Sequence, residues 1–279
     1  MFPIKDNIPT DRFPLITVLL IVINVVVFLG FEHPSGFSSV NENTVVRYGA
    51  IPYELTHWGK HCGLGNAVGP AGTLQRAPGV PTQVACTGER VPTAGGQTEI
   101  RRIPGSQPPT WATMFTAMFM HGGFLHIIGN MLFLWIFGNN VEDSMGRVRF
   151  VLFYFLGGLA ALWLQVAVSP DSTAPTIGAS GAIAAVLGGY ILLYPRARVL
   201  TLVFIIFFVT VIELPAVFVL ALWFLEQVYF GAANLTNPTG GGGGVAYWAH
   251  IGGFGFGLAL IRLFATRRDK QIPPRIPVY

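Results

Sequence analysis

The chain has 279 residues, of which 52% are hydrophobic and only 11% are charged, and its formal net charge is +4. A soluble domain has about 25% charged residues, so this composition excludes an ordinary water-exposed surface, in agreement with the mean hydropathy of +0.56. The basic residues gather at the ends of apolar segments, which indicates membrane topology rather than a nucleic-acid-binding surface. We therefore expect an all-α membrane protein that contacts lipid and no nucleic acid.

The first apolar segment, 15–31, contains no charged residue and follows a polar stretch with Lys5 and Arg12. A signal peptide is the competing interpretation, but its apolar core is about 7–15 residues long and ends at a small-residue cleavage site. This segment is longer and lacks such a site. We predict that 1–14 is a cytoplasmic N-terminus and that 15–31 is the first span.

The section 32–110 is polar, rich in Gly and Pro, and contains both cysteines, Cys62 and Cys86. We predict a long external loop, either folded or partly disordered. On an oxidising side of the membrane two cysteines favour a disulfide. Free thiols remain open, as does a zinc site that adds His57 and His61, although the spacing fits no standard zinc pattern.

Two further apolar regions follow, 111–139 and 150–168. The first is predicted to lie at the membrane interface over its early turns, where Trp is favoured, and to span from about Gly122. Its interior contains His126 and Asn130. Polar groups inside a bilayer are costly and suggest a function.

The stretch 178–190 reads G-A-S-G-A-I-A-A-V-L-G-G-Y and follows a proline-broken loop, so Ser180 is expected in the first turn of a helix. Side chains four apart share a helix face, which produces two neighbouring rows of small residues: Ser180, Ala184 and Gly188, and Gly181, Ala185 and Gly189. Such rows allow close helix packing in membranes. The expected partner helix is 245–264, where His250, Gly253 or Phe254, and Gly257 share a face. A hydroxyl and an imidazole at similar depth suggest a catalytic pair.

The region 199–230 is ambiguous, because Glu213 and Pro215 interrupt it. It fits two spans, or one span preceded by a segment that dips into the membrane. One span places the basic residues of the short loops on one side, so we favour six spans with both termini cytoplasmic. The membrane domain is then 15–265, with a basic cytoplasmic tail at 266–279. The glycine run 240–244 is interpreted as a flexible connector.

Four motifs together resemble the rhomboid intramembrane serine proteases, over about residues 1–265. H-G-G-F-L-H-I-I-G-N at 121–130 is similar to the second-span motif of that family, and V-E-D-S-M-G at 141–146 to the turn that closes this span. G-A-S-G at 178–181 matches its G-x-S-G nucleophile motif. A-H-I-G-G-F-G-F-G at 249–257 matches its A-H-x-x-G-x-x-x-G motif.

The resemblance implies a six-transmembrane helical bundle of rhomboid type, of the bacterial kind, in the plasma membrane. It makes Ser180 the nucleophile and His250 the general base, a dyad that needs no cofactor and no metal. A serine hydroxyl becomes a good nucleophile when an adjacent base takes its proton. His126 and Asn130 are expected to be oxyanion donors, and transmembrane segments of membrane proteins to be the substrates. The oligomeric state stays open. The glycines expected to serve helix packing are Gly178, Gly181, Gly253 and Gly257.

Two positions depart from the family pattern. Some members have Tyr four residues after the serine, stacked on the base, where this chain has Ala184. Many have a Trp-Arg pair before the second span, where Ala112 follows Trp111 here. Another group must then orient His250, and Glu226 is a candidate.

Three other function classes are alternatives to a protease. A metal-dependent membrane enzyme using His121, His126 and His250 would need more ligands, and we expect a structural role for His121. A transporter would show inverted repeats, which the sequence lacks. The remaining alternative is a catalytically silent rhomboid-like factor for membrane-protein binding or quality control. The presence of both Ser180 and His250 favours activity.

Overall fold

The structure is a computed structural model that describes residues 2–32, 34, 40–79, 81–93, 96–205, 208–236 and 245–266. The chain forms two compact units: unit 1 contains 1–25, 128–164 and 180–279, and unit 2 contains 26–127 and 165–179. The glycine run 240–244 and the tail from 267 onward lie outside the described residues, so the predictions for them stay predictions.

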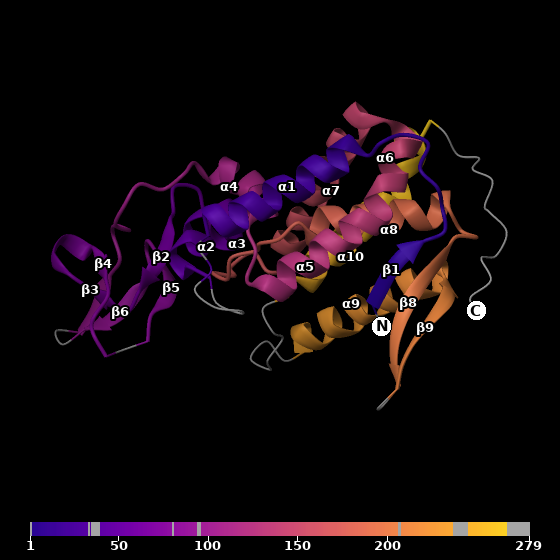
Figure 1. The fold of residues 1–279 in the computed structure, drawn as a ribbon. Helices are drawn as coiled ribbons and strands as arrows, with labels where there is room; N and C mark the ends of the chain where they lie inside the picture. The colour runs from indigo at the N-terminus through magenta and orange to yellow at the C-terminus, as the bar shows by residue number, and fades with distance from the viewer. Residues whose placement is uncertain are drawn as a thin grey trace. The chain divides into compact units, whose positions relative to one another are not determined.

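Long helices dominate the chain (Figure 1). Among the described residues, three helical segments are long and apolar enough to cross a membrane, Phe124–Met145, Arg147–Val168 and Ala216–Leu235, and two shorter apolar helices accompany them. The prediction of membrane-spanning helices is thus confirmed, while the count of six spans stays a prediction. The helices are α1 (Leu15–Gly30), α5 (Phe124–Phe133), a π-helical segment (Leu134–Gly138) continuing into α6 (Asn139–Met145), α7 (Arg147–Val168), α8 (Ser180–Leu193), α9 (Ala216–Thr236) and α10 (Tyr247–Phe264).

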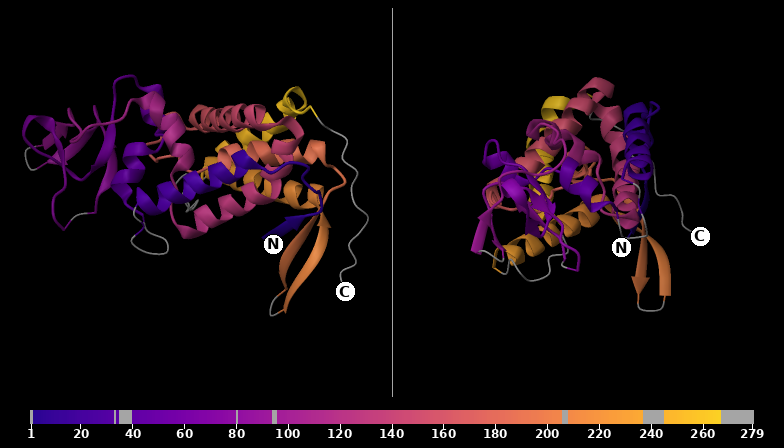
Figure 2. Two further views of the ribbon diagram at one scale, coloured as in Figure 1. Left: turned by 45° about the horizontal axis from the view of Figure 1, so that its top comes forward. Right: turned by 90° about the vertical axis from the view of Figure 1, so that its left-hand side faces the viewer.

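The all-α prediction is wrong, because unit 1 contains a three-stranded antiparallel sheet in the order β1-β8-β9. Its strands are β1 (Phe2–Asp6), β8 (Arg198–Ile205) and β9 (Phe208–Pro215). The run 199–214 is rich in β-branched and aromatic residues, which favour strands, and a continuous apolar run does not distinguish a strand from a helix. Figure 2 shows the β8–β9 hairpin projecting from the helices of its unit.

The hairpin decides the path of the ambiguous region 199–230. Strands β8 and β9 pair from Arg198↔Pro215 to Ile205↔Phe208. Proline lacks a backbone N–H and is compatible with a helix start, so the strand ends at Pro215 and α9 begins at the next residue. The region therefore contains one long helix, as favoured, preceded by a β-hairpin.

Unit 2 contains the polar section after α1, and the part of this section that the structure describes is folded. Cys62 and Cys86 lie directly opposite each other on paired strands and form a disulfide. They are buried with Val46 and Ile51 in a small apolar core. The elements are α2 (Glu42–Tyr48), α3 (Pro52–Thr56), β2 (Cys62–Gly65) paired with β5 (Gln83–Cys86), β3 (Ala67–Val68) with β4 (Leu74–Gln75), β6 (Arg90–Thr93) with β7 (Gly96–Glu99), and α4 (Thr110–Thr116).

Within unit 1, α8 and α10 pack almost backbone to backbone (Figure 1). A Cβ atom added at Gly253 would lie 2.1 Å from the carbonyl oxygen of Gly181, and one at Gly188 would lie 2.2 Å from that of Phe254. Real Cβ atoms do not approach an oxygen so closely, so only glycine fits at these positions. The small-residue faces of the two helices are therefore what allow this spacing.

Buried carboxylates join the N-terminal part of unit 1 to its helices. Glu142 accepts hydrogen bonds from the backbone N–H groups of Ile16 (3.0 Å) and Thr17 (2.8 Å) and from the Thr17 hydroxyl (2.8 Å). It thereby satisfies free donors in the first turn of α1. On β1, Asp6 accepts from the Tyr190 hydroxyl at 2.6 Å and the Asn140 amide at 2.7 Å. Burial raises the pKa of Asp6 to about 6.

Candidate active site

A candidate nucleophile and a candidate base meet at the first turns of α8 and α10. Ser180 is the first residue of α8, and His250 is the fourth residue of α10. The Ser180 Oγ lies 2.7 Å from the His250 Nε2, a good hydrogen-bond distance. Both residues are half-buried, so the surrounding side chains cover the pair only in part. An imidazole in this position can take the hydroxyl proton.

The other ring nitrogen of His250 contacts a residue that the sequence analysis missed. The His250 Nδ1 lies 2.7 Å from the Oε1 of Gln227 on α9. The Gln227 amide is buried, and its Nε2 donates to the Trp223 carbonyl one turn earlier at 3.3 Å. The Trp223 ring also lies against the imidazole, with 5.6 Å between ring centroids. Glu226, the candidate from the sequence, is exposed instead.

A signal for Gln227 was present in the sequence. An uncharged polar amide in an otherwise apolar span is costly unless it has a partner. The neighbouring Glu226 was the predicted partner, and a carboxylate is the usual third group behind a catalytic histidine. Which of two adjacent side chains faces α10 depends on the rotation of α9, and that is a tertiary property.

Asn130, in α5, lies in unit 1 together with Ser180 and His250. The residue is 8% exposed, and its buried Nδ2 forms no hydrogen bond with any residue that the structure describes. A buried amide donor without a partner carries a desolvation cost. Such a group is suited to bind an acceptor that arrives with a substrate.

His126 belongs to unit 2, and its environment there determines its tautomer. The Gly122 backbone N–H donates to the His126 Nδ1 at 3.2 Å. Since Nδ1 is the acceptor, the neutral ring carries its proton on Nε2. His126 therefore presents a single N–H donor at the far side of its ring.

His121 lies in a structural setting in unit 2. Its backbone N–H donates to both carboxylate oxygens of Glu32 at 3.0 Å, and its ring packs edge-on against Phe28. No group of three or more His, Cys, Asp or Glu side chains within the described ranges is placed to hold a metal ion. The disulfide uses both sulfur atoms that the zinc alternative would need.

Gly178 differs from its expected role in helix packing. It lies two residues before α8, in a backbone conformation with φ +115, and its N–H donates to the Ala117 carbonyl at 2.8 Å. That φ value is readily adopted by glycine alone, so Gly178 forms the turn that leads into α8. The expected packing glycines Gly253 and Gly257 do lie where α10 meets α8, whereas a Cβ atom at Gly181 would lie 2.7 Å from the Ala161 side chain of α7.

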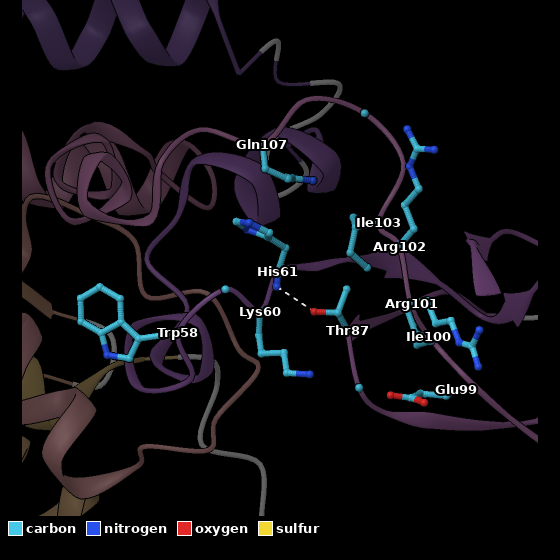
Figure 3. Close-up of a pocket in the computed structure, with 13 residues that line it drawn as sticks. Trp58, Lys60, His61, Thr87, Glu99, Ile100, Arg101, Arg102, Ile103 and Gln107 are labelled. Atoms are coloured by element: carbon cyan, nitrogen blue, oxygen red, sulfur yellow. Dashed lines mark hydrogen bonds between the residues drawn. The ribbon is translucent and has the colours of Figure 1, made fainter. Parts of the chain in front are cut away.

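A separate pocket of about 820 Å³ lies in unit 2 (Figure 3). Its walls carry the basic side chains Lys60, Arg101 and Arg102. The contact between His61 and Thr87 in this pocket uses the His61 backbone N–H, which donates to the hydroxyl at 3.0 Å. Because the imidazole does not take part in this contact, it does not activate the hydroxyl as a base would. The pocket lacks the chemistry of the Ser180–His250 pair.

Comparison with known proteins identifies the family. The model of the Rhomboid domain matches residues 108–267, which include Asn130, Ser180, Gln227 and His250. The chain belongs to the rhomboid family, and with its apolar helices it is a multi-pass membrane protein.

Three relatives illustrate the range of the family. The chain is 33% identical over 164 residues to Rhomboid protein 1, mitochondrial, of Saccharomyces cerevisiae. This match covers 57% of the chain and 43% of the relative. It is 31% identical over 152 residues to RHOMBOID-like protein 4 of Arabidopsis thaliana, covering 53% and 32%. It is 37% identical over 78 residues to the Rhomboid protease GluP of Bacillus subtilis, covering 28% and 15%. The chain thus spans less than half the length of these relatives, and they do not distinguish a bacterial from a mitochondrial type.

Proposed function

We propose that this protein is an intramembrane serine endopeptidase that cleaves transmembrane segments of other membrane proteins. The observation that carries the proposal is the 2.7 Å contact between the Ser180 hydroxyl and the His250 Nε2 in the first turns of two closely packed apolar helices. Membership of a family that includes a named rhomboid protease supports the reaction class.

In the proposed reaction, the Ser180 Oγ attacks the scissile carbonyl carbon while the His250 Nε2 takes the hydroxyl proton. The tetrahedral intermediate places a negative charge on the former carbonyl oxygen, which needs donors aimed at it. Its collapse breaks the C–N bond, His250 gives its proton to the leaving amine, and the acyl chain stays on Ser180 as an ester. Water then attacks the ester with His250 again as base, which releases the acid and regenerates the hydroxyl.

The donors proposed for the oxyanion are the Ser180 backbone N–H, the Asn130 Nδ2 and the His126 Nε2. The Asn130 Nδ2, which has no hydrogen-bond partner among the described residues, supports its part, as does the Nε2-protonated tautomer of His126. A donor that is already desolvated and held in place costs little reorganisation when charge develops, which is the physical basis of oxyanion stabilisation.

The proposed topology has six spans, formed by α1, the continuous α5–α6 segment, α7, α8, α9 and α10. It is supported by the single long helix α9 after the hairpin. Basic residues, including Arg147, Arg196 and Arg262, also lie at the helix ends that this topology places on one side of the membrane. The loop 169–177 contains no Lys or Arg. Both termini then lie on the cytoplasmic side, and Ser180 lies near the outer surface. The proposed location is a plasma membrane of bacterial type.

The test uses purified protein reconstituted in liposomes with a fluorogenic transmembrane substrate and, in parallel, a fluorophosphonate probe. We expect cleavage and labelling by the wild type, and loss of both in Ser180→Ala and His250→Ala. Ser144→Ala is the matched control, because its buried hydroxyl donates to a carbonyl of its own helix. Cleavage that persists in Ser180→Ala, or that a chelator abolishes, would overturn the serine mechanism. Absence of both cleavage and labelling in the wild type would favour the catalytically silent factor.

A further inference from the structure

Gln227 faces the catalytic imidazole in one defined orientation. Its amide has two distinct ends, an oxygen that only accepts and an NH₂ group that only donates. The NH₂ end donates to the Trp223 carbonyl, which cannot donate in return, so this contact distinguishes the two ends of the amide. The oxygen is thereby directed to the His250 Nδ1 at 2.7 Å.

This orientation selects one tautomer of His250. Because the Gln227 Oε1 can only accept, the hydrogen bond requires a proton on Nδ1. The neutral ring then has no proton on Nε2, the nitrogen that lies 2.7 Å from the Ser180 Oγ. That nitrogen can accept the hydroxyl proton, as a general base must. In the other tautomer an N–H would point at Ser180, and a lone pair would face the Gln227 oxygen.

No aromatic side chain of α8 takes this role, because position 184 is an alanine that is fully buried beside α10. Both groups that hold the ring come from α9: the Gln227 oxygen fixes the Nδ1 side, and the Trp223 indole lies against the ring with 37° between the planes. Helix α9 packs against α10, and both helices belong to unit 1.

We propose that Gln227 is a positioning residue that holds His250 in the Nδ1-protonated tautomer, so that Ser180, His250 and Gln227 form one hydrogen-bonded series. The inference rests on the proposed function for its catalytic meaning, but its structural content is independent of proteolysis. The third group is a neutral amide, where many serine proteases use a carboxylate. A neutral group fits this site, because an ionised carboxylate is expensive to bury among apolar helices.

The experiment compares Gln227→Met, which keeps an unbranched side chain of similar length but removes the acceptor, with Gln227→Glu, which keeps the acceptor and adds a charge. The neighbouring exposed Glu226→Gln is the matched control. We expect Gln227→Met to lower kcat by about 10- to 100-fold with KM nearly unchanged. We expect Gln227→Glu to retain more activity and to move the acidic limb of the pH–rate profile upward by about one pH unit, because a carboxylate favours the protonated ring.

A second readout does not depend on hydrolysis. Nitrogen-15 NMR of labelled histidine, with the His250 signal assigned by its loss in His250→Gln, reports which ring nitrogen carries the proton. We expect Nδ1–H in the wild type and in Glu226→Gln, and a substantial Nε2–H population in Gln227→Met. Thermal midpoints verify that each variant is folded.

The outcomes separate the two proposals. If wild-type cleavage does not depend on Ser180, the protease proposal fails, while the NMR result still decides the role of Gln227. If a folded Gln227→Met keeps both the Nδ1–H tautomer and the wild-type kcat, the positioning role is overturned even in an active protease. An Nε2–H tautomer in the wild type would overturn it as well.

Discussion

The backbone of Gly257 on α10 lies directly against the carbonyl of Ala185 on α8: a Cβ atom at 257 would come within 2.0 Å of that oxygen. The same helix pair carries Ser180 and His250, whose side chains meet at 2.7 Å. The spacing of the two backbones and the geometry of the Ser180–His250 pair are therefore one structural property. A wider spacing between α8 and α10 would therefore change the distance between the Ser180 Oγ and the His250 Nε2.

Gly257→Ala is expected to push α10 away from α8, because the added methyl overlaps backbone that has no room to move. The free energy of unfolding is predicted to fall by about 1–3 kcal/mol or more. Fluorophosphonate labelling at Ser180 should be lost. Gly255→Ala is the control, since a Cβ there meets nothing within 4 Å and alanine is the better helix former by about 1 kcal/mol. Thermal midpoints and labelling rates measure both effects. Equal behaviour of the two variants would contradict the packing argument.

Asn130→Ala is expected to lower kcat by up to about 100-fold, because the substitution removes a proposed donor to the oxyanion. The thermal midpoint should change little, since the Nδ2 lacks a hydrogen-bond partner among the described residues. Asn24→Ala is a suitable comparison: its buried amide donates to the Leu20 carbonyl of its own helix, so its loss should leave kcat unchanged. A large fall in stability with unchanged kcat for Asn130→Ala would instead assign it to cross-linking helices.

The disulfide between Cys62 and Cys86 closes a loop with a sequence separation of 24. Restriction of the unfolded chain by such a loop stabilises the fold by about 3–4 kcal/mol. We expect reductant, or the double change Cys62→Ala with Cys86→Ala, to make residues 40–110 sensitive to limited proteolysis. Reductant should have no further effect on the double variant, which serves as its control. Unchanged protease resistance of the reduced wild type would show that the small apolar core suffices.

Asp6 is expected to make stability depend on pH. Its pKa of about 6 in the folded chain lies above the ordinary value of 3.8 because of burial. The folded state therefore binds the proton more tightly, and this contribution, about 3 kcal/mol at most, is fully present below about pH 4 and is lost as the pH rises through about 6. Asp6→Asn keeps an acceptor for Tyr190 and should remove this dependence. Thermal midpoints of both proteins between about pH 4 and 7.5 provide the measurement, and parallel curves would refute the assignment.

Glu142→Ala is expected to free three donors in the first turn of α1, the N–H groups of Ile16 and Thr17 and the Thr17 hydroxyl. Hydrogen bonds to a charged group contribute about 1.5–3 kcal/mol each, and water replaces part of that. We expect a lower thermal midpoint and faster hydrogen exchange at the start of α1. Glu213→Ala, whose carboxylate pairs with Arg198 at 3.6 Å in the hairpin, should leave exchange in α1 as it is.

The sequence alone determined the features that depend on local chemistry. Proline-broken loops and small-residue periodicity placed Ser180 at the start of a helix, and α8 begins at that residue. The uncharged segments 15–31, 150–168 and 178–190 marked helices, and the combination of short motifs indicated the rhomboid family, in agreement with the domain match over 108–267. Each of these signals lies within one continuous stretch of residues.

The tertiary structure decided everything that depends on how distant segments meet. Within the apolar run 199–214, β8 and β9 pair with each other, and β1 from the far end of the chain adds a third strand beside β8. Gln227, and not Glu226, reaches His250 because the rotation of α9 against α10 turns the amide inward. Helical periodicity defines the faces of each helix, but the free energy that selects which face is buried comes from packing between elements. A single stretch of sequence does not contain that information.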